Sequence, residues 1–416
     1  MTEVENCGDR KTLEGMRVLE MGQMLAGPFA STLLAWFGAE VIKVEPPLGG
    51  DPIRTWRGLH NGTALWWYIL GRNKKCITID LHQAEGQALV RELAKKVDVV
   101  IENFKPGTME KWGLGYEDLK RLNPKLIMAR VSGWGQTGPN SRKPGFASVA
   151  EGVGGLRYVN GYPDLPPVRP NLSLGDTIAG LTAAFGILAA VHYRDVVGTG
   201  VGQVVDVAIY ESIFNLLEGA IPEYDKLGLI RERMGTTLSG IVPTGTYPCK
   251  EGKFVIIGAN GDSIFKRLCN AMGRSDMGSD PRFSHNDDRV AHQQEIEKVI
   301  VEWTSRHTLS EIQQLLEIAD VPAGPIYSVA DMLRDPHFIA RGLFENTILP
   351  DGTTVKLPIF TPKLTESPGR TDWIGPSLGE HNREVLGGWL GLSDEALTKL
   401  AANGTIASAE AEIEAD

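Results

Sequence analysis

Short apolar runs alternate with longer amphipathic stretches along the first third of the chain. The runs at residues 17–21, 41–44, 76–81, 97–104 and 126–134 are expected to be strands, and the stretches at 28–37, 83–96 and 117–122 are expected to be helices. Strands that alternate with helices of this length form a parallel sheet with helices on both faces. The pattern therefore predicts a large, doubly wound, Rossmann-like α/β domain.

The pattern changes farther along the chain. Residues 177–193 are mostly small and apolar and predict a long helix, after which a glycine-rich turn leads to a strand at 203–209. A segment rich in Gly, Pro and Thr then precedes a strand at 253–262 and two helices, near 264–272 and 293–304. This change in residue composition indicates a second domain.

A chain of 416 residues is long enough for two domains. The expected parts are a large domain (10–224), a smaller α/β domain (225–330), a return to the large domain (331–400) and an acidic tail that frays (401–416).

Charge and hydropathy narrow the classes of function. Lys and Arg number 42 and Asp and Glu 52, so the formal net charge is −10, which argues against a nucleic-acid partner. Hydrophobic residues make up 42% and the mean hydropathy is −0.12, as in soluble globular proteins. The longest apolar run, residues 178–191, is shorter than the roughly 20 residues of a membrane span, so we expect no membrane segment. Four cysteines without a CxxC pair, and an N-terminus without an apolar leader, predict reduced thiols and a cytoplasmic location.

Motifs of nucleotide, metal and serine chemistry are missing from the sequence. Glu45 ends the second strand where a dinucleotide-binding acid would stand, but the first turn is GQMLAGP rather than GxGxxG. The same turn lacks the Lys-Ser/Thr of a P-loop, because Pro28 and Phe29 follow Gly27. The eight histidines form no HExxH pair, and no serine lies in GxSxG. We therefore expect no metal site and no nucleophile activated by an imidazole.

One carboxylate can act as a nucleophile without a partner base. An Asp side chain has a reference pKa near 3.9, about three units below neutrality, so it is an anion at pH 7. Asp176 precedes the long predicted helix, whose free N–H groups and positive end favour the charged form by about 0.3–1 kcal/mol. The position suits a nucleophile and equally a helix N-cap, and the local pattern leaves both interpretations open.

Seven motifs in order resemble one family over nearly the whole chain. They lie at residues 15–54, 73–81, 98–119, 132–146, 174–180, 198–212 and 254–265, and include GQMLAGP, NKKCITIDL, VIENFKPG, SGWGQTGP, LGDTIAG and GANGDSIF. These stretches are similar to the family III CoA-transferases, the group that contains formyl-CoA transferase, carnitine CoA-transferase and the α-methylacyl-CoA racemases. Within this group, the sequence most resembles the succinyl-CoA-dependent dicarboxylate CoA-transferases.

The resemblance implies that Asp176, in LGDTIAG, is the catalytic nucleophile. In the family such a carboxylate attacks an acyl-CoA thioester to give an acyl-aspartyl anhydride, and the returning CoA forms an aspartyl-CoA thioester that the acceptor acid opens. The implied substrates are coenzyme A, as acyl-CoA, and a small carboxylic acid, with no permanently bound cofactor. A glycine-containing loop of the small domain covers the nucleophile in the family, and Gly258, Ala259, Asn260 and Gly261 are similar to it.

The resemblance also implies a set of contacts to CoA. The corresponding residues are Met24, Leu25, Ala26, Asn73, Lys74, Asn103, Phe104 and Lys111. Lysines suit the phosphates of CoA, and an aromatic ring offers an apolar face. Leu25 and Pro144 stand where formyl-CoA transferase has Gln and Lys, which disfavours formyl-CoA and oxalate as the substrate pair.

Arg54 and Arg169 are candidates to bind the second carboxylate of a dicarboxylic acid, because a guanidinium pairs with a carboxylate through two hydrogen bonds. Either can equally be a surface charge or part of an interdomain ion pair. Arg169 lies seven residues before Asp176, in a VRP stretch similar to those of dicarboxylate transferases.

Two other functions share this fold and stay open as alternatives. A racemase needs a His-Asp pair after a glycine-containing loop, and this chain has Gly145, Phe146 and Ala147 there, of which none can carry a proton. A homologue that binds CoA without catalysis would keep every motif. The family forms interlocked homodimers, so the resemblance implies the same assembly here.

Overall fold

The structure, a computed structural model, describes residues 10–407 and divides them into two compact units. Unit 1 contains the residues up to Leu156, Pro170–Leu217 and the residues from Gly342 onward, and unit 2 contains Arg157–Arg169 and Glu218–Arg341. The expected small domain, residues 225–330, lies within unit 2. The prediction placed residues 157–169, 218–224 and 331–341 in the large domain, whereas they belong to unit 2.

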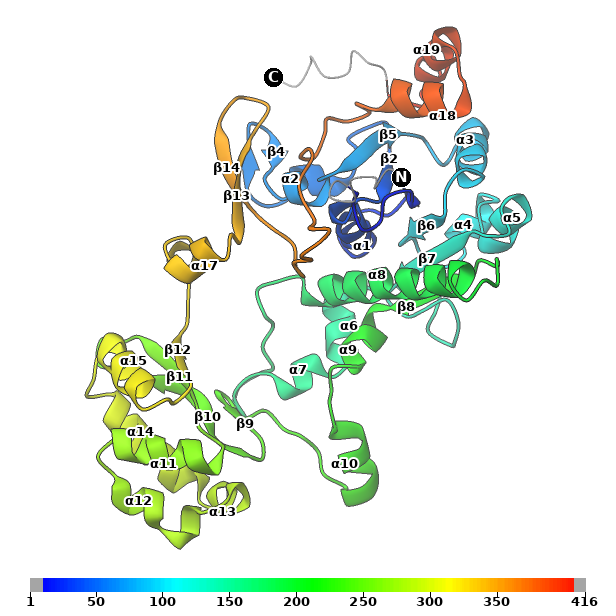
Figure 1. Cartoon of the computed structure of the whole chain (residues 1–416). Helices are drawn as coiled ribbons and strands as arrows, with labels where there is room; N and C mark the ends of the chain where they lie inside the picture. The colour runs from blue at the N-terminus through cyan, green and yellow to red at the C-terminus, as the bar shows by residue number, and fades with distance from the viewer. Residues whose placement is uncertain (1–9, 408–416) are drawn as a thin grey trace, which may run out of the picture. The chain divides into compact units, whose positions relative to one another are not determined.

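Unit 1 is built on a six-stranded parallel sheet with the order β5-β2-β1-β6-β7-β8 (Figure 1). The strands are β1 (Arg17–Glu20), β2 (Glu40–Glu45), β5 (Lys74–Thr78), β6 (Val99–Glu102), β7 (Ile127–Ser132) and β8 (Val204–Ala208). The chain adds β2 and β5 on one side of β1 and then β6, β7 and β8 on the other. Strand order therefore reverses between β1 and β6, as in a doubly wound sheet, and the predicted fold class is confirmed.

Helices and hairpins surround this sheet. The helical elements of unit 1 include α1 (Ala26–Trp36), η2 (Pro52–Thr55), α2 (Trp67–Leu70), α3 (Ala84–Ala94), α4 (Thr108–Lys111), α5 (Tyr116–Leu122), α6 (Ala147–Val153), α8 (Leu174–Asp195), α9 (Ile209–Phe214), the π-helical turn η4 (Arg383–Gly387), α18 (Gly388–Leu390) and α19 (Asp394–Ala402). Two short antiparallel hairpins pair β3 (Leu59–His60) with β4 (Thr63–Ala64) and β13 (Phe344–Ile348) with β14 (Thr354–Pro358).

Both faces of the sheet are buried. Side chains alternate along a strand, so Val18 faces the core under α1 and α8, whereas Leu19 faces the core under α3 and α5. A strand with two buried faces has no polar side, which explains why these strands are continuous apolar runs in the sequence.

Unit 2 contains a four-stranded antiparallel sheet with the order β12-β11-β10-β9. Its strands are β9 (Thr237–Leu238), β10 (Ile241–Pro248), β11 (Phe254–Gly258) and β12 (Ala323–Pro325). Its helices include α10 (Ala220–Leu227), α11 (Asp262–Ala271), α12 (Ser275–Ser279), η3 (Pro281–Phe283), α13 (Asn286–Ala291), α14 (Gln293–Thr304), α15 (Leu309–Ile318), α16 (Val329–Met332) and α17 (Pro336–Ala340), and α7 (Leu156–Val159) lies where the chain passes between units. Val255 and Ile257 of β11 pack with Phe265, Ile296 and Ile312 in a core of its own.

A stripe of small residues lets α8 pack closely on α1. Ala179, Gly180 and Ala183 are buried in this contact. A Cβ on Gly180 would lie 2.8 Å from the carbonyl oxygen of Ala26, so only glycine permits this approach. Among the described helices, α8 is also the one that is long and apolar enough to cross a membrane by length and composition, a test that core helices pass as well.

The predicted acidic tail is packed in its first part. α19 ends at Ala402, after which Thr405 and Ile406 are buried and Thr405 Oγ1 donates to Gln83 Oε1 (2.8 Å). Fraying from residue 401 is therefore wrong for residues 401–407, because Ile406 belongs to the core on the α3 face. The rest of the predicted tail, 408–416, lies outside the described residues.

A cluster of charged side chains, the Glu20 cluster, lies between the sheet and the first turns of α1. Glu20 of β1 pairs with Lys43 of β2 (2.6 Å) and with Lys74 of β5 (2.7 Å), and all three side chains are buried. Lys43 also pairs with Asp51 (2.8 Å), and Lys74 Nζ donates to Pro28 O (2.8 Å). The cluster thereby joins three strands to the start of α1 and to the segment after β2.

The two ammonium groups control the ionisation of Glu20. Burial alone would raise the pKa of this carboxyl group, but Lys43 and Lys74 outweigh burial and lower the pKa to about 2. The pKa of Lys43 is raised, because Asp51 and Glu20 outweigh the effect of its own burial. Glu20 and Lys43 are therefore charged at neutral pH, whereas burial and the neighbouring charge of Lys43 lower the pKa of Lys74.

Glu20→Gln is expected to lower the free energy of unfolding at pH 7 by about 3–5 kcal/mol, because it leaves two buried ammonium groups without their carboxylate. The folded pKa of Glu20 is lowered from 4.5 to about 2, so its stabilising effect is present above pH 4.5 and is lost as the pH falls toward 2. The difference between wild type and variant should therefore shrink over that range. Urea unfolding, followed by circular dichroism at several pH values, measures both effects.

Glu92→Gln is the matched control for this experiment. Glu92 pairs with Lys95 (2.5 Å) on the exposed side of α3, and such a pair contributes at most about 0.5 kcal/mol. A Glu20→Gln protein as stable as the Glu92→Gln protein at pH 7 would contradict the stabilising role of the Glu20 cluster.

Candidate active site

The loops that follow β1 and β6 meet where the strand order of the sheet reverses. In doubly wound sheets, ligands bind in the crevice at the carboxyl ends of the strands at such a point. Asn103 follows β6, and its amide group accepts from Gln23 N and donates to Gln23 O, both at 2.8 Å. Asn103 thus fixes the loop after β1 through the backbone of Gln23.

Met24, in the same loop, has a left-handed backbone with φ +63°. This conformation costs a residue with a Cβ about 1–2 kcal/mol. Asp51 stabilises it, because its carboxylate accepts from Met24 N (3.0 Å) while pairing with Lys43. The side chains of Leu25 and Ala26 are buried, so Met24 is the one of these three predicted CoA contacts whose side chain is partly open to solvent.

Asp176 lies within the first turn of α8. The helix begins at Leu174 with Ser173 as its N-cap, and the Ser173 side chain makes no capping hydrogen bond. The N-cap interpretation of Asp176 is therefore wrong, because the helix starts three residues earlier than the sequence pattern predicts. The side chain of Asp176 is half-buried at the positive end of α8, where a carboxylate is stabilised in its charged form.

Asp176 and the loop after β1 lie at the same edge of unit 1. Asp176 and Gly180 are four residues apart and share one face of α8, the face that approaches Ala26. Gly175 N donates to the buried carboxylate of Glu151 (3.2 Å), which fixes the backbone next to Asp176. The structure thus brings together the predicted nucleophile and the predicted CoA loop Met24–Ala26.

Asn73 and Lys74 are structural residues, contrary to the prediction that they contact CoA. Lys74 is fully buried, and its ammonium group is bound by Glu20 and Pro28 O. The Asn73 amide accepts from Asp372 N (2.8 Å) and donates to Arg370 O (2.8 Å). Their polar atoms are occupied inside the protein, where a phosphate cannot reach them.

Arg54 is likewise occupied within the fold, so its predicted contact with a substrate carboxylate is contradicted. Its Nε and Nη2 bind the two oxygens of Glu45 (2.7 and 2.8 Å), and Nη1 donates to Pro376 O (3.0 Å). The guanidinium also stacks on Trp67, 3.8 Å from the ring centroid. The sequence could not reveal this, because Pro376 is more than 300 residues away.

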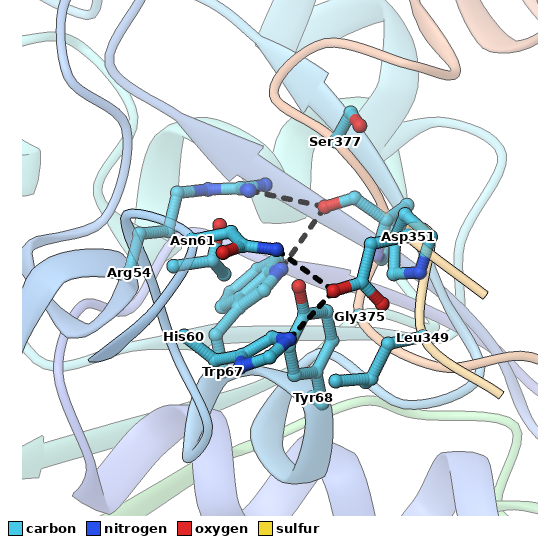
Figure 2. A pocket seen from close by; sticks show the side chains of 12 residues that line it. Arg54, His60, Asn61, Trp67, Tyr68, Leu349, Asp351, Gly375 and Ser377 are labelled. Atoms are coloured by element: carbon cyan, nitrogen blue, oxygen red, sulfur yellow. Dashed lines mark hydrogen bonds and ion pairs between the residues drawn. The ribbon is translucent and has the colours of Figure 1, made fainter. Parts of the chain in front are cut away.

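Arg54 contributes to the lining of a cavity of about 200 Å³, whose walls include both charged and apolar side chains (Figure 2). Asp351 projects into it from the turn between β13 and β14 and interacts with His60 and Asn61, each at 2.7 Å. The pKa of Asp351 is lowered to about 2, mainly by hydrogen bonds from Thr353 and further by His60. Asp176 does not line this cavity, so the cavity is separate from the candidate active site.

Phe104 and Lys111 have side chains at least partly open to solvent. Phe104 is half-buried and lies edge-on to Trp112, 5.2 Å between ring centroids. Lys111 is exposed at the end of α4. Phe104 N donates to Glu102 (2.7 Å), whose pKa is raised by burial despite its pairing with Arg130. Phe104 and Lys111 therefore remain predicted contacts to CoA.

The glycine-containing loop belongs to unit 2, between β11 and α11. Gly258 N donates to Pro322 O (3.0 Å) and Ala259 N donates to Pro243 O (2.9 Å), so these two N–H groups are used by the fold. Among the described residues, the N–H groups of Asn260 and Gly261 have no recorded protein acceptor. Residues 260 and 261 are therefore the donors that this loop can offer to a developing oxyanion.

Arg169 also belongs to unit 2, where it is exposed. Its binding of a substrate carboxylate stays a prediction. Within residues 10–407, no group of three or more His, Cys, Asp and Glu side chains could hold a metal ion.

Three residues of this site are not among those predicted from the sequence. Asp51 caps η2 by accepting from Ile53 N (3.0 Å), and the Asp-Pro pair that begins η2 is a signal that could have indicated this role. Gln23 acts through its backbone N–H and C=O groups, and such a role does not depend on the type of side chain, so the sequence gives no signal of it. Arg57 Nη2 lies 3.5 Å from Ser173 Oγ, a contact between segments that are 116 residues apart.

The chain matches the family described as CoA-transferase family III over residues 13–382. It is 50% identical over 397 residues to the succinyl-CoA–D-citramalate CoA-transferase of Chloroflexus aurantiacus, which covers 95% of this chain and 98% of that protein. It is 44% identical to the alpha subunit of a succinyl-CoA–L-malate CoA-transferase of Chloroflexus aurantiacus, over 93% of this chain and 91% of that subunit. It is 36% identical to the succinate–glutarate CoA-transferase of Agrobacterium fabrum, over 93% and 97%.

A solved structure gives the same result for the fold. The crystal structure of a CAIB/BAIF family protein from Brucella suis superposes with a TM-score of 0.80 at 34% identity. The alignment covers 91% of this chain and 99% of that one.

Asn103→Leu is expected to loosen the loop after β1, because it removes both hydrogen bonds to Gln23. Amide hydrogen exchange in a peptide spanning residues 21–26 should become about 10- to 100-fold faster, since the lost bonds contribute about 1–3 kcal/mol. Hydrogen–deuterium exchange with mass spectrometry measures this rate.

Asn123→Leu is the matched control. Asn123 likewise makes two side-chain hydrogen bonds to the backbone, donating to the carbonyls of Ala94 (3.1 Å) and Val97 (2.9 Å). These bonds lie before β6 and β7, at the amino ends of the strands. It should leave exchange in residues 21–26 unchanged. Equal exchange in the two variants would contradict the role of Asn103.

Proposed function

The chain belongs to CoA-transferase family III, and from this premise we propose that it moves CoA from succinyl-CoA to a small dicarboxylic acid, with Asp176 as the nucleophile. Relatives named for citramalate, malate and glutarate support a donor and an acceptor that each carry a second carboxylate. The observation that carries the proposal is the position of Asp176, a half-buried carboxylate at the N-terminus of α8 beside the loop after β1.

The first half-reaction consumes the donor. A carboxylate oxygen of Asp176 attacks the thioester carbonyl of succinyl-CoA, the C–S bond breaks, and CoA leaves as a thiolate. The thiolate then attacks the Asp176 carbonyl of the mixed anhydride, which breaks the C–O bond and releases succinate. Asp176 is left as a thioester of CoA.

The second half-reaction reverses these steps with the acceptor. A carboxylate of the acceptor attacks the aspartyl thioester and expels the thiolate, which gives a new mixed anhydride. The thiolate attacks the acceptor's carbonyl, so the new acyl-CoA forms and Asp176 returns as a carboxylate. No proton has to move, and the thioester bond is conserved, so the cycle needs no ATP.

Both covalent intermediates react with water, so the site has to be closed during turnover. The loop Gly258, Ala259, Asn260 and Gly261 is proposed to cover Asp176, and the free N–H groups of Asn260 and Gly261 suit the oxyanion of each tetrahedral intermediate. Met24, Phe104 and Lys111 are proposed to contact CoA, because their side chains are open to solvent near the carboxyl ends of β1 and β6.

Asp176→Asn is expected to lower kcat for exchange between succinyl-CoA and a dicarboxylate at least about a thousandfold, because an amide is a poor nucleophile. CoA binding, measured by calorimetry, should change less than about threefold. In wild type incubated with succinyl-CoA, mass spectrometry should detect a CoA adduct on the peptide that contains Asp176.

Asp195→Asn is the control, since Asp195 is the last residue of the same helix and pairs there with Arg194. It should keep wild-type exchange. Rapid exchange by Asp176→Asn, or an active wild type whose peptide never carries an adduct, would contradict the covalent mechanism.

A homodimer is the assembly proposed for this chain. The outward face of α8 exposes Leu181, Phe185 and Leu188, with exposed fractions of 50%, 74% and 40%. They lie three or four residues apart, so they form one apolar stripe on the helix, and contiguous apolar surface of this kind is typical of an interface.

Phe185→Glu is expected to convert a dimer into a monomer, because it places a charge in the middle of the proposed interface. Light scattering after size-exclusion chromatography measures the mass. Ile318→Glu is the control, since Ile318 is an exposed apolar residue at the end of α15. A wild-type monomer, or a dimer that both variants keep, would contradict this interface.

A further inference from the structure

Arg57 lies beside the start of α8 with most of its hydrogen-bonding capacity unused. Its Nη2 is 3.5 Å from the Oγ of Ser173, the N-cap of α8. Within the described part of the chain Arg57 makes no ion pair, whereas Arg54, three residues earlier, is bound by both oxygens of Glu45. A guanidinium has five N–H donors, so Arg57 can still bind an anion through two of them.

The guanidinium of Arg57 lies over the rings of two tryptophans. Its central carbon lies 4.6 Å from the ring centroid of Trp66 and 5.4 Å from that of Trp56. The two indoles stack on each other at 5.8 Å with an interplanar angle of 11°. These cation–π contacts restrict the position of the guanidinium without using its N–H groups, so the N–H groups that do not face Ser173 can bind a carboxylate.

The backbone of Arg57 is strained. Its φ is +66°, in the left-handed region that side chains other than glycine rarely adopt, although Gly58 follows directly. Strain of this kind persists where the surrounding structure requires it and concentrates at ligand-binding positions.

We propose that Arg57 binds the free carboxylate of the dicarboxylic substrates, an inference that rests on the proposed function. Ser173 precedes Asp176 by three residues, about 4.5 Å along the helix axis at 1.5 Å per residue. A short dicarboxylate whose reacting carboxyl group is at Asp176 can therefore place its other carboxylate against Arg57. Donor and acceptor both form an anhydride with the same Asp176, so one arginine serves both half-reactions.

The test compares two substrate pairs in wild type and in Arg57→Gln. With succinyl-CoA and glutarate, kcat/KM should fall about 10- to 100-fold, as expected for the loss of a charged hydrogen-bonded pair, with most of the change in the KM of glutarate. With butyryl-CoA and propionate, which lack the second carboxylate, kcat/KM should change less than threefold. The readout is the ratio of the two values, which measures preference for a dicarboxylate.

Further variants separate binding from folding. Arg57→Lys should recover part of the preference, and Trp66→Leu should lower it by less than Arg57→Gln, because the guanidinium remains but is no longer held. Arg57→Gly should lose the preference without a lower melting temperature, because glycine relieves the left-handed strain. Arg121→Gln, at an exposed arginine of α5, is the control and should keep wild-type values.

Arg169→Ala is measured in parallel, because Arg169 is the other candidate for the same carboxylate. A loss of dicarboxylate preference in Arg169→Ala together with an unchanged preference in Arg57→Gln would overturn this inference and leave the proposed function intact. Equal losses for both substrate pairs in Arg57→Gln would also overturn it. A wild type that transfers CoA to monocarboxylates only would contradict the proposed function and this inference together.

Discussion

The Glu20 cluster is the interaction on which the geometry of the active site depends. Glu20 and Lys43 are direct partners in the register of β1 and β2, and Lys74 reaches them from β5. They bind one another, Gly22 O in the loop after β1, groups of α1 and Asp51 after β2, so the cluster ties these segments to the sheet. The Met24 backbone, bound by Asp51, takes its unusual conformation from this buried arrangement.

Most of the fold can be predicted from the sequence, because apolar runs that alternate with amphipathic stretches indicate the order of strands and helices in a doubly wound sheet. The predicted strands and helices of unit 1 are present with small shifts of their ends, and the resemblance carried by the seven motifs is confirmed by the family match. The predicted start of α8 is three residues late because Leu174 and Gly175 carry no signal of a helix start, and this shift alone explains the mistaken N-cap interpretation of Asp176.

The errors at the site concern charged residues whose charges are neutralised inside the fold. Lys74 was expected at a phosphate and Arg54 at a carboxylate, yet each is neutralised inside the protein by Glu20 or Glu45. Composition gives the charge of a side chain but not its partner, so Arg54 and Arg57 look alike in GDPIRTWRG. In the folded protein Arg54 is a structural residue, whereas Arg57 lies on the surface with most of its N–H donors free.

During synthesis on the ribosome, the reversal of strand order between β1 and β6 leaves one edge of the sheet open for a long time. β2 and β5 can pair on one side of β1 as they emerge, but the other side gains its neighbour only after residues 99–102 have been made. An unpaired apolar strand edge is a template for pairing with other chains. On this side the unpaired edge passes from β1 to β6 and then to β7, and the edge strand of the folded sheet, β8, is made only at residues 204–208. The nascent sheet is therefore exposed to pairing with other chains until about half of the protein has been synthesised.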